Sequence, residues 1–218
     1  MINLVIVGTG AVAAEVTGYL ETAAYTWKES PIRIKGYLEY AEFRYLHRLY
    51  RYTAPILGSI DDYEIAEGDY FIIANADVRL RLAFLGKLKE MGAEFINLIH
   101  PTCIIAPTAE MGIGNILSPH CQIGPLARVG DFNIMTSGTM ISHDCVVGHL
   151  NSFSSVIVCG HVNIGSRNSF FVSSTVIPKI TIGDDCTIQA GMVVDKDVPD
   201  GTTVFYKYKE RIMAIPQN

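Results

Sequence analysis

Apolar residues recur at every sixth position along the second half of the chain. The positions, with one five-residue step after Phe153, are Ile105, Met111, Leu117, Ile123, Val129, Met135, Ile141, Val147, Phe153, Val158, Ile164, Phe170, Val176, Ile182, Ile188 and Val194. Neither a helix nor a half-buried strand has this period. A triangular solenoid does, because each coil of three hexapeptides contains three short strands that each point one apolar side chain inward.

A second phase of the repeat, two residues before the large apolar positions, holds small side chains. Four of the five cysteines stand in it, at Cys103, Cys121, Cys145 and Cys186. Free cysteine behaves as a small buried hydrophobe, so we interpret these four as inward packing residues. The cysteines match no zinc-ligand spacing, and we expect no metal.

The first hundred residues have a different pattern, in which strands and helices alternate. Residues 2–7 predict a strand, and the turn Gly8-Thr9-Gly10 leads into a helix that ends near Leu20. Further expected elements are strands at 32–38, 70–73 and 94–98 and a helix at 78–91. They predict a small parallel sheet, half of a Rossmann domain, whose glycine turn suits one nucleotide diphosphate at the helix amino terminus.

Composition and charge exclude several classes of function. The chain has 218 residues, is 49% hydrophobic and has a formal net charge of −5. Its basic residues form no dense stripe, so nucleic acid is not an expected partner. The first residues lack the basic start of a signal peptide, and no apolar run approaches the roughly 20 residues that span a bilayer. We therefore expect a soluble cytoplasmic protein without a membrane partner.

Local motifs along nearly the whole chain support one family. They are APILGSIDD at 54–62, FIIANADVR at 71–79, NLIHP at 97–101 and ISHDCVVG at 141–148. Together with the repeat and the glycine turn, the chain resembles the bacterial nucleotide-sugar N-acetyltransferases and sialic acid O-acetyltransferases. The resemblance implies an α/β half-Rossmann domain for the nucleotide sugar at 1–100. It also implies a left-handed parallel β-helix acyltransferase domain with a carboxyl-terminal tail at 101–218, in a homotrimer.

The same resemblance implies roles for individual residues. His143 would be the general base and Asp144 its acidic partner, and histidine suits this role because its ordinary pKa lies near neutrality. The amide of Gly160 would hold the developing oxyanion. Expected contacts with the coenzyme A thioester are Val172, Ser173, Ala190 and Lys196. Expected contacts with the nucleotide are Gly8, Thr9, Gly10, Glu39, Asn75 and Asp77.

The expected function is acetyl transfer from acetyl-CoA to a nucleotide-linked amino sugar, of the 4-amino-4,6-dideoxy type, for surface glycan synthesis. The alternatives are O-acetylation of a sialic acid and a nucleotide-sugar-binding solenoid without catalysis. Two segments depart from the family. Residues 38–55 are rich in tyrosine and arginine, which suits either stacking on a base or sugar or a packing helix at the rim of the trimer. The usual glycine-proline-alanine turn near the carboxyl terminus is absent, so Lys207 or Lys209 is a candidate for holding the phosphates of the donor.

Overall fold

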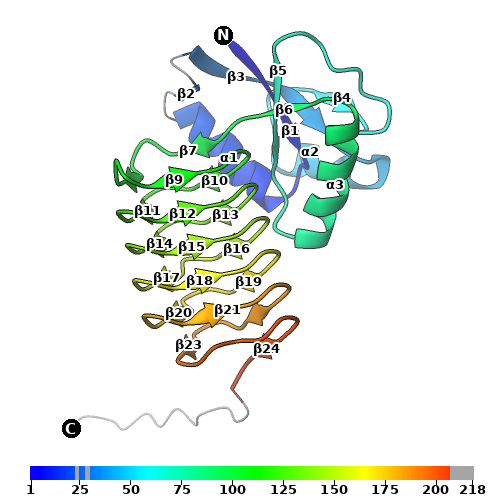
Figure 1. The fold of residues 1–218 in the computed structure, drawn as a ribbon. Helices are drawn as coiled ribbons and strands as arrows, with labels where there is room; N and C mark the ends of the chain where they lie inside the picture. Colours follow the sequence, from blue (N-terminus) through cyan, green and yellow to red (C-terminus); the bar gives the residue numbers. More distant parts are fainter. Residues whose placement is uncertain (23–24, 28–29, 207–218) are drawn as a thin grey trace, which may run out of the picture.

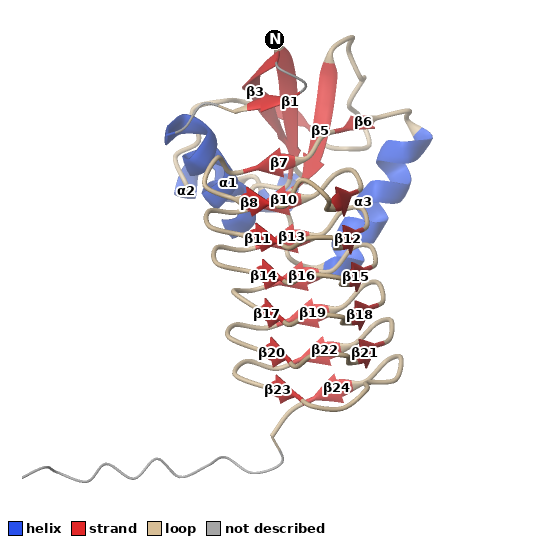
Figure 2. Cartoon of the chain, turned by 60° about the vertical axis from the view of Figure 1, so that its left-hand side comes forward, coloured by secondary structure: helices blue, strands red, loops and turns tan. Residues whose placement is uncertain are grey.

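The computed structural model describes residues 1–22, 25–27 and 30–206, and the chain forms two parts in succession (Figure 1). A small α/β part comes first, and a three-sided solenoid of short parallel strands extends from it. Figure 2 shows the coils of the solenoid stacked below the α/β part. This architecture fits a left-handed β-helix acetyltransferase.

A sheet forms the centre of the α/β part. Its strand order is β2-β3-β1-β5-β6, with β4 paired to β3, and every pairing except β2 with β3 is parallel. The strands are β1 (Ile2–Val7), β2 (Thr26–Trp27), β3 (Ser30–Leu38), β4 (Ile56–Gly58), β5 (Asp69–Ile73) and β6 (Glu94–Phe95). The strands expected at 2–7, 32–38 and 70–73 are confirmed to within two residues.

Helices pack against both faces of this sheet, because β1 presents apolar side chains in both directions. Helix α1 lies on the side of Leu4 and Ile6, whereas α3 lies on the side of Val5 and Val7. The helical elements are α1 (Ala11–Thr22), η1 (Ala41–Phe43), α2 (Tyr45–Leu49) and α3 (Val78–Glu90). The tyrosine- and arginine-rich segment forms the short helical elements η1 and α2 over part of its length, and neither contains a buried residue.

Three parallel sheets form the sides of the solenoid, and we number them I to III. Sheet I contains β7 (Leu98–Ile99), β10 (Ile116–Leu117), β13 (Ile134–Met135), β16 (Ser152–Phe153), β19 (Ser169–Phe170), β22 (Thr187–Ile188) and β24 (Thr203–Val204). Sheet II contains β8 (Ile104–Ile105), β11 (Gln122–Ile123), β14 (Met140–Ile141), β17 (Ile157–Val158), β20 (Thr175–Val176) and β23 (Val193–Val194). Sheet III contains β9 (Glu110–Met111), β12 (Arg128–Val129), β15 (Val146–Val147), β18 (Asn163–Ile164) and β21 (Thr181–Ile182). The chain turns at the I–II, II–III and III–I corners in that order.

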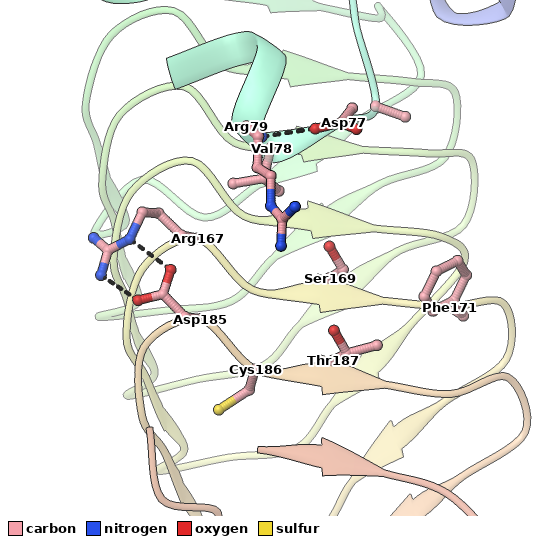
Figure 3. Close-up of a pocket in the computed structure, with 10 residues that line it drawn as sticks. Asp77, Val78, Arg79, Arg167, Ser169, Phe171, Asp185, Cys186 and Thr187 are labelled. Atoms are coloured by element: carbon pink, nitrogen blue, oxygen red, sulfur yellow. Dashed lines mark hydrogen bonds and ion pairs between the residues drawn. The ribbon is translucent and has the colours of Figure 1, made fainter. Parts of the chain in front are cut away.

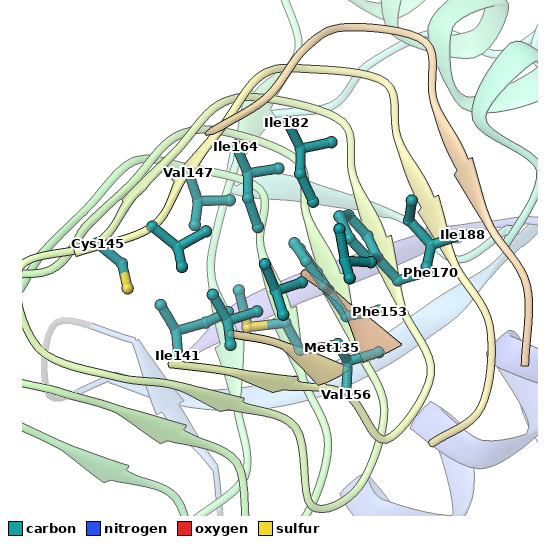
Figure 4. Packing of buried hydrophobic residues seen from close by; sticks show 14 of the residues in the cluster. Met135, Ile141, Cys145, Val147, Phe153, Val156, Ile164, Phe170, Ile182 and Ile188 are labelled. Atoms are coloured by element: carbon teal, nitrogen blue, oxygen red, sulfur yellow. The ribbon is translucent and has the colours of Figure 1, made fainter. Parts of the chain in front are cut away.

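The predicted apolar series fills the centre of the solenoid (Figure 4). Successive members stack along the axis, as the parallel rings of Phe153 and Phe170 do at a centroid separation of 4.8 Å. Cys121, Cys145 and Cys186 are buried among them as free thiols, which confirms their interpretation as packing residues. The five-residue step falls in the I–II corner before β17, whose pairing with β14 stays in register, so the deletion is absorbed by the turn.

An asparagine ladder closes the III–I corner. In the middle of the ladder, the backbone N–H and the side-chain amide of Asn133 both donate to Oδ1 of Asn115, at 2.8 and 3.1 Å. The same side-chain amide donates to the carbonyl of Gly148, and Asn151 repeats the pattern one coil further on. Buried amides must be paired to be stable, and this ladder pairs them between coils.

The strand expected at 94–98 is divided between the two parts of the molecule, which corrects the sequence-based expectation. β6 pairs with β5 of the α/β sheet, whereas β7 pairs with β10 and so begins the solenoid. Asn97 lies between them, and its Oδ1 accepts a hydrogen bond from the N–H of Asn115, as the first rung of the ladder. The change of sheet therefore occurs where the ladder starts.

Within the described ranges, none of the helices is both long and apolar enough to cross a bilayer.

Candidate active site

His143 and Asp144 lie in the turn of the II–III corner between β14 and β15. Nδ1 of His143 lies 2.8 Å from Oδ2 of Asp144, and both side chains are partly exposed, at 52% and 36%. Asp144 has a left-handed backbone conformation, with φ of 56°, that recurs at this turn position in the neighbouring coils. The fold therefore positions the pair through the backbone, and the carboxylate orients the imidazole ring.

The II–III corner also explains why Gly160 lies beside His143. The same turn position is occupied in successive coils by Pro107, Pro125, His143, Gly160 and Pro178. Proline has no backbone N–H, so its presence in three of these coils indicates that the fold needs no hydrogen bond from the backbone N–H at this position. Gly160 has such an N–H, and within the described part of the chain it donates to no protein acceptor. An unpaired donor thus lies one coil from the imidazole.

Two glycines leave the space in which the histidine sits. A Cβ added to Gly160 would lie 2.5 Å from Cε1 and 2.6 Å from Nε2 of His143, so the ring rests on the glycine. A Cβ added to Gly124, one coil earlier, would lie 2.6 Å from the backbone nitrogen of His143. Gly124 was missed in the sequence, where its only signal is membership of the glycine phase of the repeat.

A second histidine approaches the same carboxylate. The ring of His161 meets that of His143 edge to face at a centroid distance of 5.2 Å, and its Nε2 lies 3.9 Å from Oδ2 of Asp144. His161 could not be placed here by sequence reasoning, because the five-residue step obscures its alignment with Asp144.

A cavity of about 250 Å³ adjoins His143 on the outer side of sheet II. Its walls come from β8, β11, β14 and the turns that follow them, and they are largely apolar. The residues expected to bind the donor lie around the same sheet. Gly160 and Lys196 belong to the II–III corner with His143, whereas Val172, Ser173 and Ala190 lie in exposed turns of the I–II corner. A single chain therefore places the two groups at opposite edges of sheet II.

The expected nucleotide contacts gather at the carboxyl ends of β1, β3 and β5. Glu39 is buried there, and its Oε2 accepts hydrogen bonds from the N–H and the hydroxyl of Thr9, both at 2.8 Å. Oε1 of Glu39 accepts from the N–H of Tyr40. The carboxylate is thus engaged in holding the glycine turn of Gly8 and Gly10.

Tyr52 supports the same turn from the tyrosine-rich segment. Its hydroxyl donates to the carbonyls of Thr9 and Gly10, at 3.0 and 3.1 Å, while its ring stacks on Tyr37. Burial raises the pKa of Tyr52, so the hydroxyl remains a donor at neutral pH. Sequence reasoning named the segment but missed this residue and its role in shaping the turn.

The polar side chains that follow β5 accept hydrogen bonds from nearby backbone N–H groups. Oδ1 of Asn75 accepts from the N–H of Asp77, and Asp77 caps α3 by accepting from the N–H groups of Arg79 and Leu80. Arg81 then joins this edge to the solenoid. Arg81 is only 1% exposed, and its guanidinium donates to the carbonyl of Asn75 and, at 2.6 Å, to that of Leu150 at the III–I corner.

A second cavity, of about 480 Å³, opens where α3 begins beside sheet I (Figure 3). Arg79 points into it from the helix, and Arg167 lines it from the III–I corner, paired with Asp184 and Asp185. Ser169 and Thr187 contribute hydroxyl groups from sheet I. This cavity continues the carboxyl edge of the α/β sheet along the solenoid, on a different side from His143.

The arrangement of an α/β part on a solenoid of three parallel sheets, with an exposed histidine in a corner turn, fits a β-helix acetyltransferase. PerB from Caulobacter crescentus, solved in complex with CoA and GDP-perosamine, matches with a TM-score of 0.76 and 25% identity over 93% of each chain. WeeI from Acinetobacter baumannii has a TM-score of 0.77 at 20% identity, over 93% of this chain and 96% of its own. The acetyltransferase domain of PglB from Neisseria gonorrhoeae has a TM-score of 0.74 at 21% identity, with the same coverage. The resemblance expected from the sequence is confirmed.

Similarity to curated sequences is confined to a short stretch. The bifunctional protein GlmU of Synechococcus elongatus is 39% identical over 49 residues, which are 22% of this chain and 11% of GlmU. No family model matches the sequence.

Proposed function

We propose that the protein transfers the acetyl group of acetyl-CoA to the amine of a nucleotide-linked sugar. One observation carries the proposal: the imidazole of His143, oriented by Asp144, rests on Gly160 with its unpaired amide. A base and an oxyanion donor are the two groups that direct acyl transfer requires. PerB, which has the same fold, was solved with CoA and GDP-perosamine, and this supports an amino sugar as the acceptor.

In the proposed reaction, His143 acts through Nε2. Its Nδ1 donates to the carboxylate of Asp144, which leaves the lone pair of Nε2 available to the acceptor. As the sugar nitrogen attacks the thioester carbon, a C–N bond forms and Nε2 takes the proton of the amine. The C–S bond then breaks, and the imidazolium returns the proton to the thiolate of coenzyme A. The sequence is direct, without an acyl-enzyme.

The amide of Gly160 would stabilise the oxygen of the tetrahedral intermediate. An unpaired donor fixed by the solenoid needs no rearrangement as the charge develops, which is the property of an effective oxyanion site. The ring of His143 lies over the same glycine, so base and donor act on adjacent atoms of the reacting group. No metal is required in this scheme.

A homotrimer would complete the site. The outward positions of sheet II include Ile104, Met140, Ile157 and Val193, of which Ile104 is 65% exposed. Sheet III presents Glu110, Arg128 and Asn163 at its outward positions, together with the apolar Val146. Apolar surface of this extent indicates a protein interface. Three left-handed prisms packed by sheet II would bring the II–III corner of one subunit to the I–II corner of the next.

This packing would unite the two halves of the donor site. His143, Gly160 and Lys196 would come from one subunit, and the turns with Val172 and Ala190 from its neighbour, with coenzyme A in the groove between them. The segment with Lys207 and Lys209, the other candidates for its phosphates, lies outside the described residues.

We assign the nucleotide to the α/β part, residues 1–100, as a half-Rossmann domain. The turn of Gly8 and Gly10 at the start of α1 is suited to a diphosphate, because helix amino termini attract anions. The sugar would extend into the cavity below α3, beside Arg79 and Arg167, and reach a His143 supplied by the neighbouring subunit. With these substrates, we place the proposed reaction in the cytoplasm, before surface glycan assembly.

The test is release of coenzyme A thiol from acetyl-CoA with a panel of nucleotide-linked 4-amino sugars and free sialic acid. Wild type should turn over an amino sugar, and His143→Ala should lose about 10²–10⁴-fold, the usual contribution of a general base. His149→Ala is the matched control, because His149 also pairs with an aspartate, Asp131, at the III–I corner. Turnover of sialic acid alone would contradict the amino-sugar acceptor and indicate O-acetylation of a sialic acid instead. Nucleotide-sugar binding without turnover would indicate a non-catalytic solenoid.

A further inference from the structure

Three potential metal ligands converge at the II–III corner. One nitrogen each from His143 and His161 and one oxygen of Asp144 all lie within 4.8 Å of one another, a grouping found once in the described ranges. The carboxylate oxygen lies between the two imidazoles, 2.8 Å from Nδ1 of His143 and 3.9 Å from Nε2 of His161. All three side chains are between one third and just over one half exposed, so an ion can reach them from solvent.

The solenoid holds the ligands in place without help from an ion. Asp144 and His161 occupy the same turn position in consecutive coils, with nearly equal φ values of 56° and 60°. The strands on either side of both turns pair in register, Ile141 with Val158 and Val147 with Ile164. Two coils are separated by about 4.8 Å, which is the spacing of paired strands. The set is therefore largely preorganised.

We infer that this cluster is a zinc site, and that zinc occupying it switches the enzyme off. Two imidazoles, one carboxylate and a water form the tetrahedral ligand set that Zn²⁺ prefers, at about 2.0–2.2 Å from each protein ligand. Neighbouring ligands of such an ion are about 3.3 Å apart, between the 2.8 and 3.9 Å observed. We expect small side-chain rotations to close the site, because the three ligand atoms already lie within 4.8 Å of one another.

The ion would inhibit because it takes the nitrogen that orients the base. Nδ1 of His143 donates to Asp144 when the imidazole is ready to accept a proton at Nε2. With zinc on Nδ1, the neutral ring carries its proton on Nε2 and has no lone pair for the acceptor. Inhibition thus rests on the proposed function, whereas zinc binding does not.

One neighbour opposes the ion. Lys179 holds the same turn position one coil beyond His161, with a φ of 68°. Its charge should weaken the site, so that Lys179→Gln binds zinc more tightly than wild type.

Binding is tested first, on the intact chain, by competition of Zn²⁺ with a chromophoric chelator. Wild type should bind one ion per chain, and His161→Asn should bind about tenfold more weakly or worse, as expected when a zinc site loses a group it needs. Asparagine is chosen because it tolerates the left-handed conformation of His161. The control is His149→Asn, which alters a pair of comparable exposure that has no third ligand. Equal zinc affinity in wild type and His161→Asn would overturn the site.

Activity distinguishes the two proposals. Thiol release by wild type should fall as zinc is added and return on chelation, whereas thiol release by His161→Asn, expressed relative to its own metal-free rate, should resist zinc. If the protein acetylates none of the sugars but still binds zinc in a way that depends on His161, the zinc site stands and the proposed function is rejected. Inhibition that persists in His161→Asn would show that zinc acts elsewhere and reject the inferred switch.

Discussion

Two corners of one solenoid each carry a histidine paired with an aspartate, yet their surroundings differ. At the II–III corner, His143 rests on a glycine with an unpaired amide and adjoins an apolar cavity. At the III–I corner, Nδ1 of His149 accepts from the backbone N–H of Asp131, beside the buried asparagine ladder. One imidazole is oriented by a carboxylate, and the other serves the backbone. A histidine–aspartate pair is therefore not sufficient for an active site, and the groups around the pair determine whether the histidine can act as a base.

The largest expected effect concerns the two faces that flank the II–III corner. Ile157 on sheet II and Val146 on sheet III are exposed to nearly the same extent, 42% and 44%. If sheet II forms the trimer, Ile157→Lys should leave monomers and abolish turnover, because a charge would be buried at the interface. Val146→Lys should remain trimeric and active. Sedimentation velocity measures the oligomeric state of the two variants, and thiol release measures their turnover. If Ile157→Lys remains a trimer, the interface does not lie on sheet II.

A smaller but sharper effect is expected from one glycine at each corner. Gly160→Ala places a methyl group against the ring of His143 and should lower kcat about 10²–10³-fold, the loss typical of a disturbed oxyanion site. Its urea midpoint should change little, because the ring can move toward solvent. Gly148→Ala places a methyl group 2.5 Å from the carbonyl oxygen of Gly165. It should cost about 1–3 kcal/mol of stability and leave kcat of the folded protein near wild type.

The ladder should matter for stability and not for chemistry. Asn133→Ala removes the two side-chain hydrogen bonds that Asn133 donates to Asn115 and Gly148, and the buried N–H of Asn151 loses its acceptor. We expect a loss of about 2–4 kcal/mol in the free energy of unfolding, measured by urea denaturation. Asn163→Ala, at an exposed position of sheet III, should stay within about 0.5 kcal/mol. A similar loss in both variants would contradict the role of the ladder.

Much of the fold could be predicted because its signals are local and repeated. The apolar period fixed the solenoid, and the strand and helix patterns of the first part held to within two residues at most boundaries. The asparagine ladder was also present as Asn115, Asn133, Asn151 and Asn168, but a polar residue inside a coil is easily taken for a small spacer.

The site was only partly predictable, since it depends on which coils become neighbours. His143 and Asp144 are adjacent in sequence and therefore visible. Arg81 lies about seventy residues from its partner Leu150, and nothing near either one signals the contact. His161 was missed for a different reason: the five-residue step shifts its place in the repeat, so it does not align with Asp144 at a spacing of eighteen.

The smallest expected effect concerns the ion pairs at the III–I corner, where acid should remove a contribution that is already weak. Hydrogen bonds from Arg167 hold the pKa of Asp185 below its ordinary value of 3.8. A lowered folded-state pKa means that the carboxylate stabilises the fold above that ordinary value and ceases to do so as the pH falls through the lowered one. Because the pair is largely exposed, Arg167→Gln should cost only about 0.2–1 kcal/mol of stability at pH 7, and the difference from wild type should vanish in strong acid.

If the cavity below α3 accepts the sugar, Arg167→Gln should also raise KM for the acceptor, without the loss of kcat expected for Gly160→Ala. An unchanged KM would remove Arg167 from the acceptor path and leave it a purely structural residue of the corner that carries the ladder.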